Sequence, residues 1–456
     1  MNKRSAARFP FRKVSEMRIA FIMPCVGRKP GRPYVKTWQM EPLAFAVLSA
    51  LTPRKIDRVL HDDRIEEIPY DDPVDLAAIS VETYTAKRAY QIADEYRRRK
   101  VPLVMGGFHA TLVPDEVMEH ADSVVIGGAE KSWPRLLNDF QNNRMRRFYR
   151  ERIQPDLAGI FPDLSIYAGK KYARISLVET GRGCPFACEF CSITAFFGRT
   201  VHSRPVEDVV TELGSLDNRN VVFFIDDNIA ADVPRAHELF SSMVPLKIRW
   251  VGQVSIHAAR DEGLIRRMKQ SGCLGVLIGF ESLDPSNLAV MGKTVNNAAR
   301  DYEDCLSVFR RHRMIIYGTF MFGYDNDTAD LFARTYRLVQ RNRFFFAAFN
   351  HLVPFPGTPL YARLQKENRL LYDRWWLEPG YRFGDLAFRP GTISADRLAA
   401  LCLVYRRRMY SLPSIIRRGL DFRCNCRNPF LALAFFSLNW LSGIDVDRRQ
   451  GLPLGA

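Results

Sequence analysis

Short apolar runs alternate with helical patterns through the first third of the chain. Four runs are continuously hydrophobic, at residues 18–25, 75–81, 101–107 and 123–128. A continuous run, unlike an alternating one, predicts a strand whose two faces are both covered. Helical patterns lie between these runs, at 85–99 and 131–140. Strands that alternate with helices predict a Rossmann-like, mainly parallel sheet, which we place at residues 17–143, after a basic tail at 1–16.

A second, longer series of apolar runs occupies residues 173–369. Helical patterns separate six candidate strands, at 174–180, 221–227, 247–253, 275–282, 314–323 and 344–353. Repeated β/α units with short connections predict a barrel, and six units rather than eight predict a partial, TIM-like (β/α)6 barrel. The polar stretch between the two series, residues 144–172, has no clear period and is interpreted as a linker.

The last part of the chain, residues 370–456, has a different composition and is predicted to be mainly helical. A basic helical pattern covers 394–419, and an apolar run follows at 429–441. That run is too short to span a bilayer, so we expect a helix that packs on its domain or lies at a membrane interface.

The net charge and the cysteine content limit the partners and the cellular location that we expect for this protein. The 456 residues carry a net charge of +16, spread over short basic runs without an aromatic-interleaved RNA-binding pattern. Nucleic acid is therefore not an expected partner; solvated helix faces, an anionic lipid surface or a phosphorylated substrate explain the charge. Nine cysteines without an apolar leader run predict a reducing, cytoplasmic location and metal-binding thiols rather than disulfides.

Three of the cysteines form a motif after the first strand of the second series. The segment "ETGRGCPFACEFC" places Cys184, Cys188 and Cys191 in a C-x3-C-x2-C spacing. Structural zinc takes four ligands and ferredoxin runs supply four cysteines, whereas this segment offers three. Three thiolates on a four-iron cluster leave one iron open to another ligand. In β/α barrels the loops after the strands carry the active site.

This motif in its setting resembles the radical S-adenosylmethionine (SAM) superfamily. The resemblance implies a [4Fe-4S] cluster on the three cysteines and SAM on the open iron, where one-electron reduction yields a 5′-deoxyadenosyl radical. It also implies a SAM contact for Glu281, at the end of the fourth strand, and an adenine-binding stretch from Gly318 to Gly323. A strand-end carboxylate and close strand packing are the alternatives. Asp227, with its neighbours Asp226 and Asn228, either lines the pocket or caps the next helix.

The sheet domain resembles the cobalamin-binding domain found in one subgroup of that superfamily. The resemblance rests on "VLHDDRIEEI", "VMGGFHATLVPDE" and "ADSVVIGGAEKSWPRLL". It implies that cobalamin approaches the backbone at two glycine pairs, and tight turns are the alternative explanation for them; the pairs are Gly106 with Gly107 and Gly127 with Gly128. Where relatives that ligate cobalt carry D-x-H-x-x-G, this chain has Arg64 in place of the histidine. We expect cobalamin without that ligand, and loss of cobalamin is the alternative.

Together these features predict a radical SAM enzyme, with an unassigned catalytic residue. Its reaction is expected to be methylation, carbon–carbon bond formation or rearrangement at an unactivated carbon of a small or lipid-like substrate. Expected partners are an external one-electron reductant of the flavodoxin or ferredoxin type and a peripheral membrane surface.

Two alternatives belong to other classes. One is an iron–sulfur electron carrier or sensor, and the other is a methylthiotransferase-like RNA modifier. The latter usually carries a further three-cysteine set, whereas the sheet domain holds only Cys25. Cys424 and Cys426 form a C-x-C pair without a four-ligand set around it, and their role is not assigned.

Overall fold

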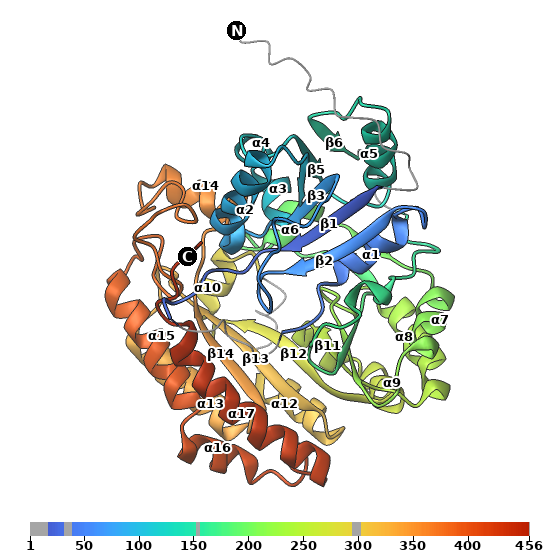
Figure 1. Ribbon diagram of the computed structural model, residues 1–456. Coiled ribbons are helices and arrows are strands. Elements are labelled where there is room, and N and C mark those ends of the chain that lie inside the picture. The colour runs from blue at the N-terminus through green and yellow to red at the C-terminus, as the bar shows by residue number, and fades with distance from the viewer. Residues whose placement is uncertain (1–16, 32–38, 152–155, 294–301, 456) are drawn as a thin grey trace. The chain divides into compact units, whose positions relative to one another are not determined.

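The computed structural model describes residues 17–31, 39–151, 156–293 and 302–455 (Figure 1). These residues form two compact units. The first runs to Lys171 and includes Leu454 and Gly455, whereas the second comprises Gln39, Met40 and Tyr172–Pro453. Each unit contains one six-stranded sheet.

The first unit is a parallel sheet with the strand order β2-β1-β3-β4-β5-β6. Its strands are β1 (Arg18–Met23), β2 (Asp57–Asp62), β3 (Leu76–Ser80), β4 (Leu103–Gly106), β5 (Ser123–Ile126) and β6 (Phe148–Arg150). Its helices are α1 (Leu43–Leu51), η2 (Thr83–Thr85), α2 (Ala86–Arg98), α3 (Phe108–Leu112), α4 (Pro114–Met118), α5 (Ser132–Gln141) and η3 (Leu164–Tyr167). The Rossmann-like prediction is confirmed. Because the order reverses beside β1, the carboxyl ends of β1 and β3 mark the position where such sheets bind ligands.

Two strands of this sheet were not among the predicted ones. β2 reads "DRVLHD" and carries charge at both ends, so its apolar run is too short to stand out. β6 lies inside the stretch interpreted as a linker and pairs in parallel with β5. Its burial alternates, with Tyr149 buried between two exposed neighbours. Both strands lie at sheet edges, where a weak apolar signal suffices for pairing.

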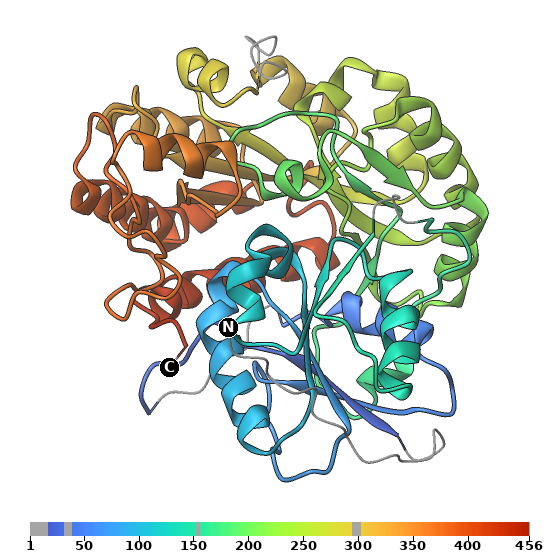
Figure 2. The same ribbon diagram turned by 90° about the horizontal axis from the view of Figure 1, so that it is seen from above.

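The second unit is a parallel sheet in which each strand pairs with its neighbour in sequence. Its strands are β7 (Ile175–Val178), β10 (Val221–Phe224), β11 (Arg249–Val254), β12 (Cys273–Glu281), β13 (Ile315–Phe322) and β14 (Phe346–His351). The connecting helices α7 (Val206–Ser215), α8 (Val233–Met243), α9 (Glu262–Gln270), α12 (Tyr302–Arg311) and α13 (Ala329–Arg341) lie along its outer side in Figure 2. The prediction of a partial (β/α)6 barrel is confirmed. A core that includes Trp250, Phe280 and Phe320 fills the space between sheet and helices.

The C-terminal region is helical, as predicted. It comprises α14 (Pro359–Lys366), α15 (Ala395–Met409), α16 (Leu412–Gly419) and α17 (Pro429–Arg449). The apolar run at 429–441 forms the first part of α17, a helix of 21 residues that continues through more polar residues to Arg449. By length and composition alone, α17 is long and apolar enough to cross a membrane, whereas the apolar run by itself is not.

A fully buried arginine fastens α16 and α17 to the barrel. Arg418 donates hydrogen bonds to the carbonyls of Phe344 and Phe345, at 3.0 and 2.9 Å, and to Asn439 Oδ1 at 3.0 Å. It also donates to the Met409 carbonyl at 2.8 Å. Burial lowers the pKa of Arg418 to about 10. Protein oxygens thus replace the water that the guanidinium loses on burial. They are the carbonyls just before β14, the carbonyl at the end of α15 and the Asn439 amide oxygen of α17.

We predict that Arg418→Met destabilises the protein by about 3 kcal/mol, because several buried oxygens lose their donor. Arg417→Met, an exposed neighbour on the same helix, should change stability by less than about 0.5 kcal/mol. Urea unfolding followed by circular dichroism measures both variants. Equal unfolding midpoints for the two variants would contradict this assignment.

Candidate active site

The three clustered cysteines lie at the carboxyl ends of the second unit's strands. They follow β8 (Gly181–Gly183), which pairs antiparallel with β9 (Val201–Ser203), and they precede or begin α6 (Ser192–Phe197). Gly183 has φ +85°, and a Cβ there would lie 2.1 Å from the Thr200 carbonyl oxygen. Only glycine fits this position, so the hairpin fixes where the cysteine segment leaves the sheet.

Loops that follow β12 and β14 anchor the cysteine segment. The Glu189 amide donates to the Met291 carbonyl, and the Leu360 amide donates to the Glu189 carbonyl, both at 3.0 Å. The Glu189 carboxylate also pairs with Arg363 of α14 at 2.8 Å. A Cβ at Gly292 would lie 2.8 Å from the Ala187 carbonyl oxygen. Two distant parts of the chain therefore hold the residues on either side of Cys188.

The three thiols are mutually close and largely shielded from water. Cys188 is buried, while Cys184 and Cys191 are partly buried. Burial chiefly, with the charges of Cys191, Glu281 and Cys184 and against the lowering effect of Lys293, raises the pKa of Cys188 to about 12. Burial also raises the pKa of Cys184. Without a metal centre Cys184 and Cys188 are protonated at neutral pH, so keeping them as thiolates requires bound cations.

Three thiols with no fourth in the segment match the ligand number of a [4Fe-4S] cluster that has one open iron. Within residues 17–31, 39–151, 156–293 and 302–455, no three His, Cys, Asp or Glu side chains converge on a single-ion position. In a [4Fe-4S] cluster each thiolate binds a different iron, so its sulfurs stand further apart than the ligands of one ion. Three soft thiolates with one nearby lysine and no fourth thiol in the segment fit such a cluster.

Glu281 and Lys293 form a buried ion pair beside the cysteines. Glu281 ends β12 with φ +62°, next to a register shift in the pairing with β13. Its Oε1 lies 2.7 Å from Lys293 Nζ, and the two side chains are 12% and 13% exposed. A Cβ at Gly279 would lie 2.3 Å from Glu281 Oε1. The sequence singled out Glu281 but not Lys293, because no local pattern marks a lysine whose partner lies 12 residues away.

The two glycines predicted to receive adenine are closely packed by side chains. A Cβ at Gly318 would lie 2.4 Å from Phe344 Cε2, and one at Gly323 would lie 2.9 Å from Phe388 Cζ. Close packing thus accounts for both glycines, and the adenine contact stays a prediction.

The buried Asp327 follows Gly323 by four residues and accepts hydrogen bonds from the amides of Gly323 and Tyr324, at 2.5 and 3.1 Å. This carboxylate fixes the turn after β13.

The carboxylates after β10 bind the start of the cysteine segment. Asp226 accepts from the Thr180 amide at 3.0 Å and from its hydroxyl at 2.6 Å, and burial raises its pKa to about 7. Asp227 accepts from the Gly183 amide at 2.9 Å. The cap of α8 is a different residue, Asp232, which accepts from the Arg235 amide. Asp226 and Asp227 are therefore loop supports, and the helix-cap alternative for them is wrong.

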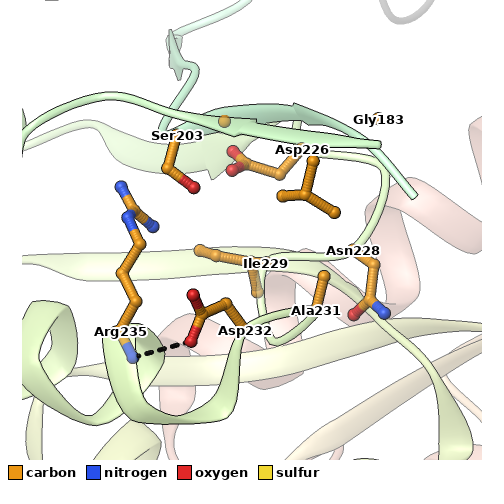
Figure 3. A pocket seen from close by; sticks show the side chains of 10 residues that line it. Gly183, Ser203, Asp226, Asn228, Ile229, Ala231, Asp232 and Arg235 are labelled. Atoms are coloured by element: carbon orange, nitrogen blue, oxygen red, sulfur yellow. Dashed lines mark hydrogen bonds between the residues drawn. The ribbon is translucent and has the colours of Figure 1, made fainter. Parts of the chain in front are cut away.

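A small pocket is lined in part by residues of this hairpin (Figure 3). Asp226, Asp232 and Arg235 line it, and Figure 3 shows Arg235 extending toward Ser203. Arg235 donates to the carbonyls of Thr180 and Arg204, at 2.9 and 2.8 Å. Its side chain therefore connects α8 to the residues that flank the two hairpin strands. It helps to fix the position of the hairpin.

In the first unit, the glycine pairs differ in what surrounds them. Gly107 has φ +102°, and a Cβ there would lie 2.9 Å from the Val81 carbonyl oxygen, so its turn is tight. Gly106 would meet only ordinary contacts, while Gly127, with φ +83°, faces open space. Gly128 follows directly in an ordinary backbone conformation, and its predicted cofactor contact stays a prediction. Gly127 is thus the position where a ligand can approach the backbone most closely.

The first unit offers no histidine at the predicted cobalt position. Arg64 donates to Asp62 from Nε at 2.9 Å and from Nη2 at 2.7 Å, which closes that turn with an ion pair. His109 is fully buried, and its two ring nitrogens lie 3.2 Å from Thr83 Oγ1 and from Glu116 Oε1. Both nitrogens already have partners, so His109 has a structural role.

Comparison with known proteins identifies the class of this enzyme. A profile of the radical SAM superfamily matches residues 178–339, which include the cysteine segment and strands β10 to β13. The chain belongs to the radical SAM superfamily, whose enzymes use SAM and a [4Fe-4S] cluster.

Named relatives make the resemblance more specific. The chain is 30% identical over 389 residues to bacteriochlorophyllide d C-12(1)-methyltransferase of Chlorobaculum tepidum, covering 83% of this chain and 84% of that protein. It is 28% identical to the C-8(2)-methyltransferase of the same organism, over 73% and 78% of the two chains. The fold matches the radical SAM methyltransferase TsrM of Kitasatospora setae, with 16% identity, coverage of 95% and 99%, and a TM-score of 0.67.

We predict that Arg363→Met loosens the cysteine segment, because Glu189 loses its ion pair. After anaerobic reconstitution, the variant should lose iron to a chelator on the order of tenfold faster than the unmodified protein. Arg341→Met is the matched control, since Arg341 pairs with Glu303 on the exposed surface, at 2.7 Å. Identical rates of iron loss for Arg363→Met and the unmodified protein would show that the ion pair does not hold the segment.

Proposed function

We propose that this enzyme methylates an unactivated carbon of a hydrophobic small molecule, of the tetrapyrrole or lipid-like class, with cobalamin as methyl carrier. One observation carries the proposal: the 30% identity to a bacteriochlorophyllide methyltransferase extends over more than four-fifths of both chains. The similarity therefore includes the sheet unit as well as the barrel. TsrM, whose fold matches, has been solved with cobalamin and a [4Fe-4S] cluster bound.

In this proposal Cys184, Cys188 and Cys191 each hold one iron of the cluster. When bound there, the cluster would supply the one-electron chemistry by which SAM is split into methionine and the 5′-deoxyadenosyl radical. Lys293 offsets part of the negative charge that three thiolates bring into a buried region. Glu281 is held beside them by Lys293 at 2.7 Å, so it can accept a hydrogen bond from the amino or hydroxyl groups of SAM.

The remaining predicted contacts concern the adenine and the entrance to the loop. The stretch from Gly318 to Gly323 is kept as the proposed adenine contact, with Phe344 and Phe388 filling the space beside its two end glycines. Asp227 supports the Gly183 amide, at 2.9 Å, and orients the segment in which Cys184 lies. Its role is thus to position the loop rather than to contact SAM.

The first unit is proposed to hold cobalamin at the carboxyl edge of its sheet. Its strand order places a ligand position beside the ends of β1 and β3. Gly127 offers open space over its backbone, as a flat macrocycle needs. The Arg64–Asp62 ion pair and the partnered His109 leave cobalt without a ligand from either residue.

The partners follow from the chemistry. In the proposed methylation, reductive cleavage of one SAM would consume one electron, and restoring the cobalamin methyl carrier after transfer to the substrate radical would consume another, so an external reductant of the flavodoxin or ferredoxin type would supply both. A cytoplasmic location, where thiols stay reduced, suits the free cysteines of the described residues.

The cluster assignment predicts the behaviour of two cysteine variants. Reconstituted protein should contain about four irons per chain and, with dithionite and SAM, produce 5′-deoxyadenosine. Cys188→Ala should abolish that product, because one iron loses its protein ligand. Cys426→Ala should leave iron content and product unchanged. Undiminished 5′-deoxyadenosine from Cys188→Ala would overturn the assignment, and iron well above four per chain would indicate a second cluster.

The cobalamin proposal has its own test. Protein incubated with hydroxocobalamin should retain about one equivalent after gel filtration, and the reduced cob(II) form should give an electron paramagnetic resonance spectrum without coupling to a histidine nitrogen. Gly127→Val should reduce retention. Gly159→Val is the matched control, because it shares a positive φ (+68° against +83°) and open space at the Cβ position. No retained corrin, or equal retention by both variants, would contradict the proposal.

A further inference from the structure

The last two helices expose an unusually apolar face to solvent. We call this surface the C-terminal apolar face; its members are Leu412, Ile416, Leu420, Phe422, Phe430, Leu433, Phe436, Trp440, Leu441 and Ile444. Phe422 is 75% exposed, Leu433 71% and Trp440 61%. Large side chains with such exposure are normally scattered singly, and here they gather within 33 residues of chain.

These residues form stripes on two adjacent helices. On α17 they recur at 433, 436, 440 and 444, which is one face of an α-helix. On α16 they recur at 412 and 416 and continue to 420, just past its end. A Cβ at Gly419 would lie 2.8 Å from Phe436 Cζ, so the stripes adjoin, and Figure 1 shows the two helices side by side.

The opposite face of α17 is packed and polar where it meets the barrel. Leu431, Phe435 and Asn439 are buried, four residues apart. Asn439 Oδ1 accepts from Arg418, and its Nδ2 donates to the Phe345 carbonyl at 3.2 Å. A membrane-spanning position would break these bonds and place Asn439 in hydrocarbon. The helix therefore lies along a surface rather than across a bilayer.

The segment that carries the apolar face is rich in arginine. Residues 404–450 contain nine arginines against three aspartates, with no lysine or glutamate, which is an excess of six positive charges. Arg417, Arg423 and Arg448 are exposed. Two of the aspartates, Asp421 and Asp445, are buried, so the outward charge is almost entirely positive.

We propose that the C-terminal apolar face docks peripherally on an anionic phospholipid bilayer. Tryptophan, phenylalanine and leucine enter the headgroup boundary, while the arginines meet lipid phosphates. A second copy of the chain is a poorer partner, because it would bring two arginine-rich segments together. A nucleic acid offers charge but no apolar phase for these side chains.

The docking surface is separate from the candidate active site within the second unit. Arg249, the first residue of β11, lies 4.8 Å over the Phe430 ring, and Phe345, which precedes β14, packs against Phe435. Both contacts are at the amino ends of the strands, whereas the cysteines follow the carboxyl ends. Membrane docking can therefore be removed without altering the cysteine site, and this inference does not depend on the proposed function.

Vesicle flotation tests the proposal with the full-length protein. Vesicles of phosphatidylcholine and phosphatidylglycerol in equal parts should carry the protein upward, and phosphatidylcholine vesicles should carry far less. Leu433→Ser combined with Trp440→Ser should reduce binding about tenfold or more, because both side chains are exposed and their apolar contact with lipid is lost. Val244→Ser, at an exposed apolar residue elsewhere in the second unit (36% exposed), should bind like the unmodified protein.

A second measurement reports on the same surface directly. Trp440 is the exposed tryptophan among those described, since Trp133, Trp250, Trp375 and Trp376 are buried. Brominated lipids should quench its fluorescence, and Trp440→Phe should remove that quenching.

Four results would overturn the proposal. The first is that the protein does not float with anionic vesicles, and the second is that the double variant floats as well as the unmodified protein. The third is that the membrane-bound protein resists alkaline extraction, as a spanning helix would. The fourth is that the protein forms a dimer, binds no vesicles, and becomes monomeric in the double variant.

Discussion

Three thiols stay in one arrangement because two distant loops hold the residues between them. The backbone of Glu189 bonds to Met291 and Leu360, and its carboxylate pairs with Arg363. Cys184 and Cys188 lie in neither a helix nor a strand. The contacts of Glu189, made by segments that follow strands of the sheet, therefore hold them in place. The succession of parallel strands brings the loops after β12 and β14 back to the same edge. The barrel thus positions the two parts of the chain that hold the irregular cysteine segment.

Electrostatics then decides what such a segment can do. Burial disfavours thiolate, raising the pKa of Cys188 to about 12, and a single lysine, Lys293, compensates part of the charge. A bound cationic metal centre would offset the charge that remains. Lys293 also holds Glu281, whose left-handed backbone at φ +62° is a strained position for a residue other than glycine. Strain of that kind persists where the surrounding contacts over-determine it.

The sequence predicted the features with strong local signals and missed those set by tertiary contacts. Buried strands and the C-x3-C-x2-C spacing stood out, because apolar runs and clustered cysteines need no partner to be recognised. β2 and β6 did not, since pairing at a sheet edge tolerates short and charged strands. Lys293, Arg363 and Arg418 matter through residues up to 174 positions away, and no local pattern marks them. His109 follows a glycine turn in the sequence, and its partners Thr83 and Glu116 are visible only in the fold.

The central claim is that three protein thiolates leave one iron for SAM. Pulsed electron–nuclear double resonance on the reduced cluster tests it most directly, with SAM carrying ¹⁵N in its amino group and ¹⁷O in its carboxylate. This account predicts hyperfine coupling from both labels, because amino nitrogen and carboxylate oxygen bind the open iron. Saturating SAM that gives no coupling from either label would contradict it.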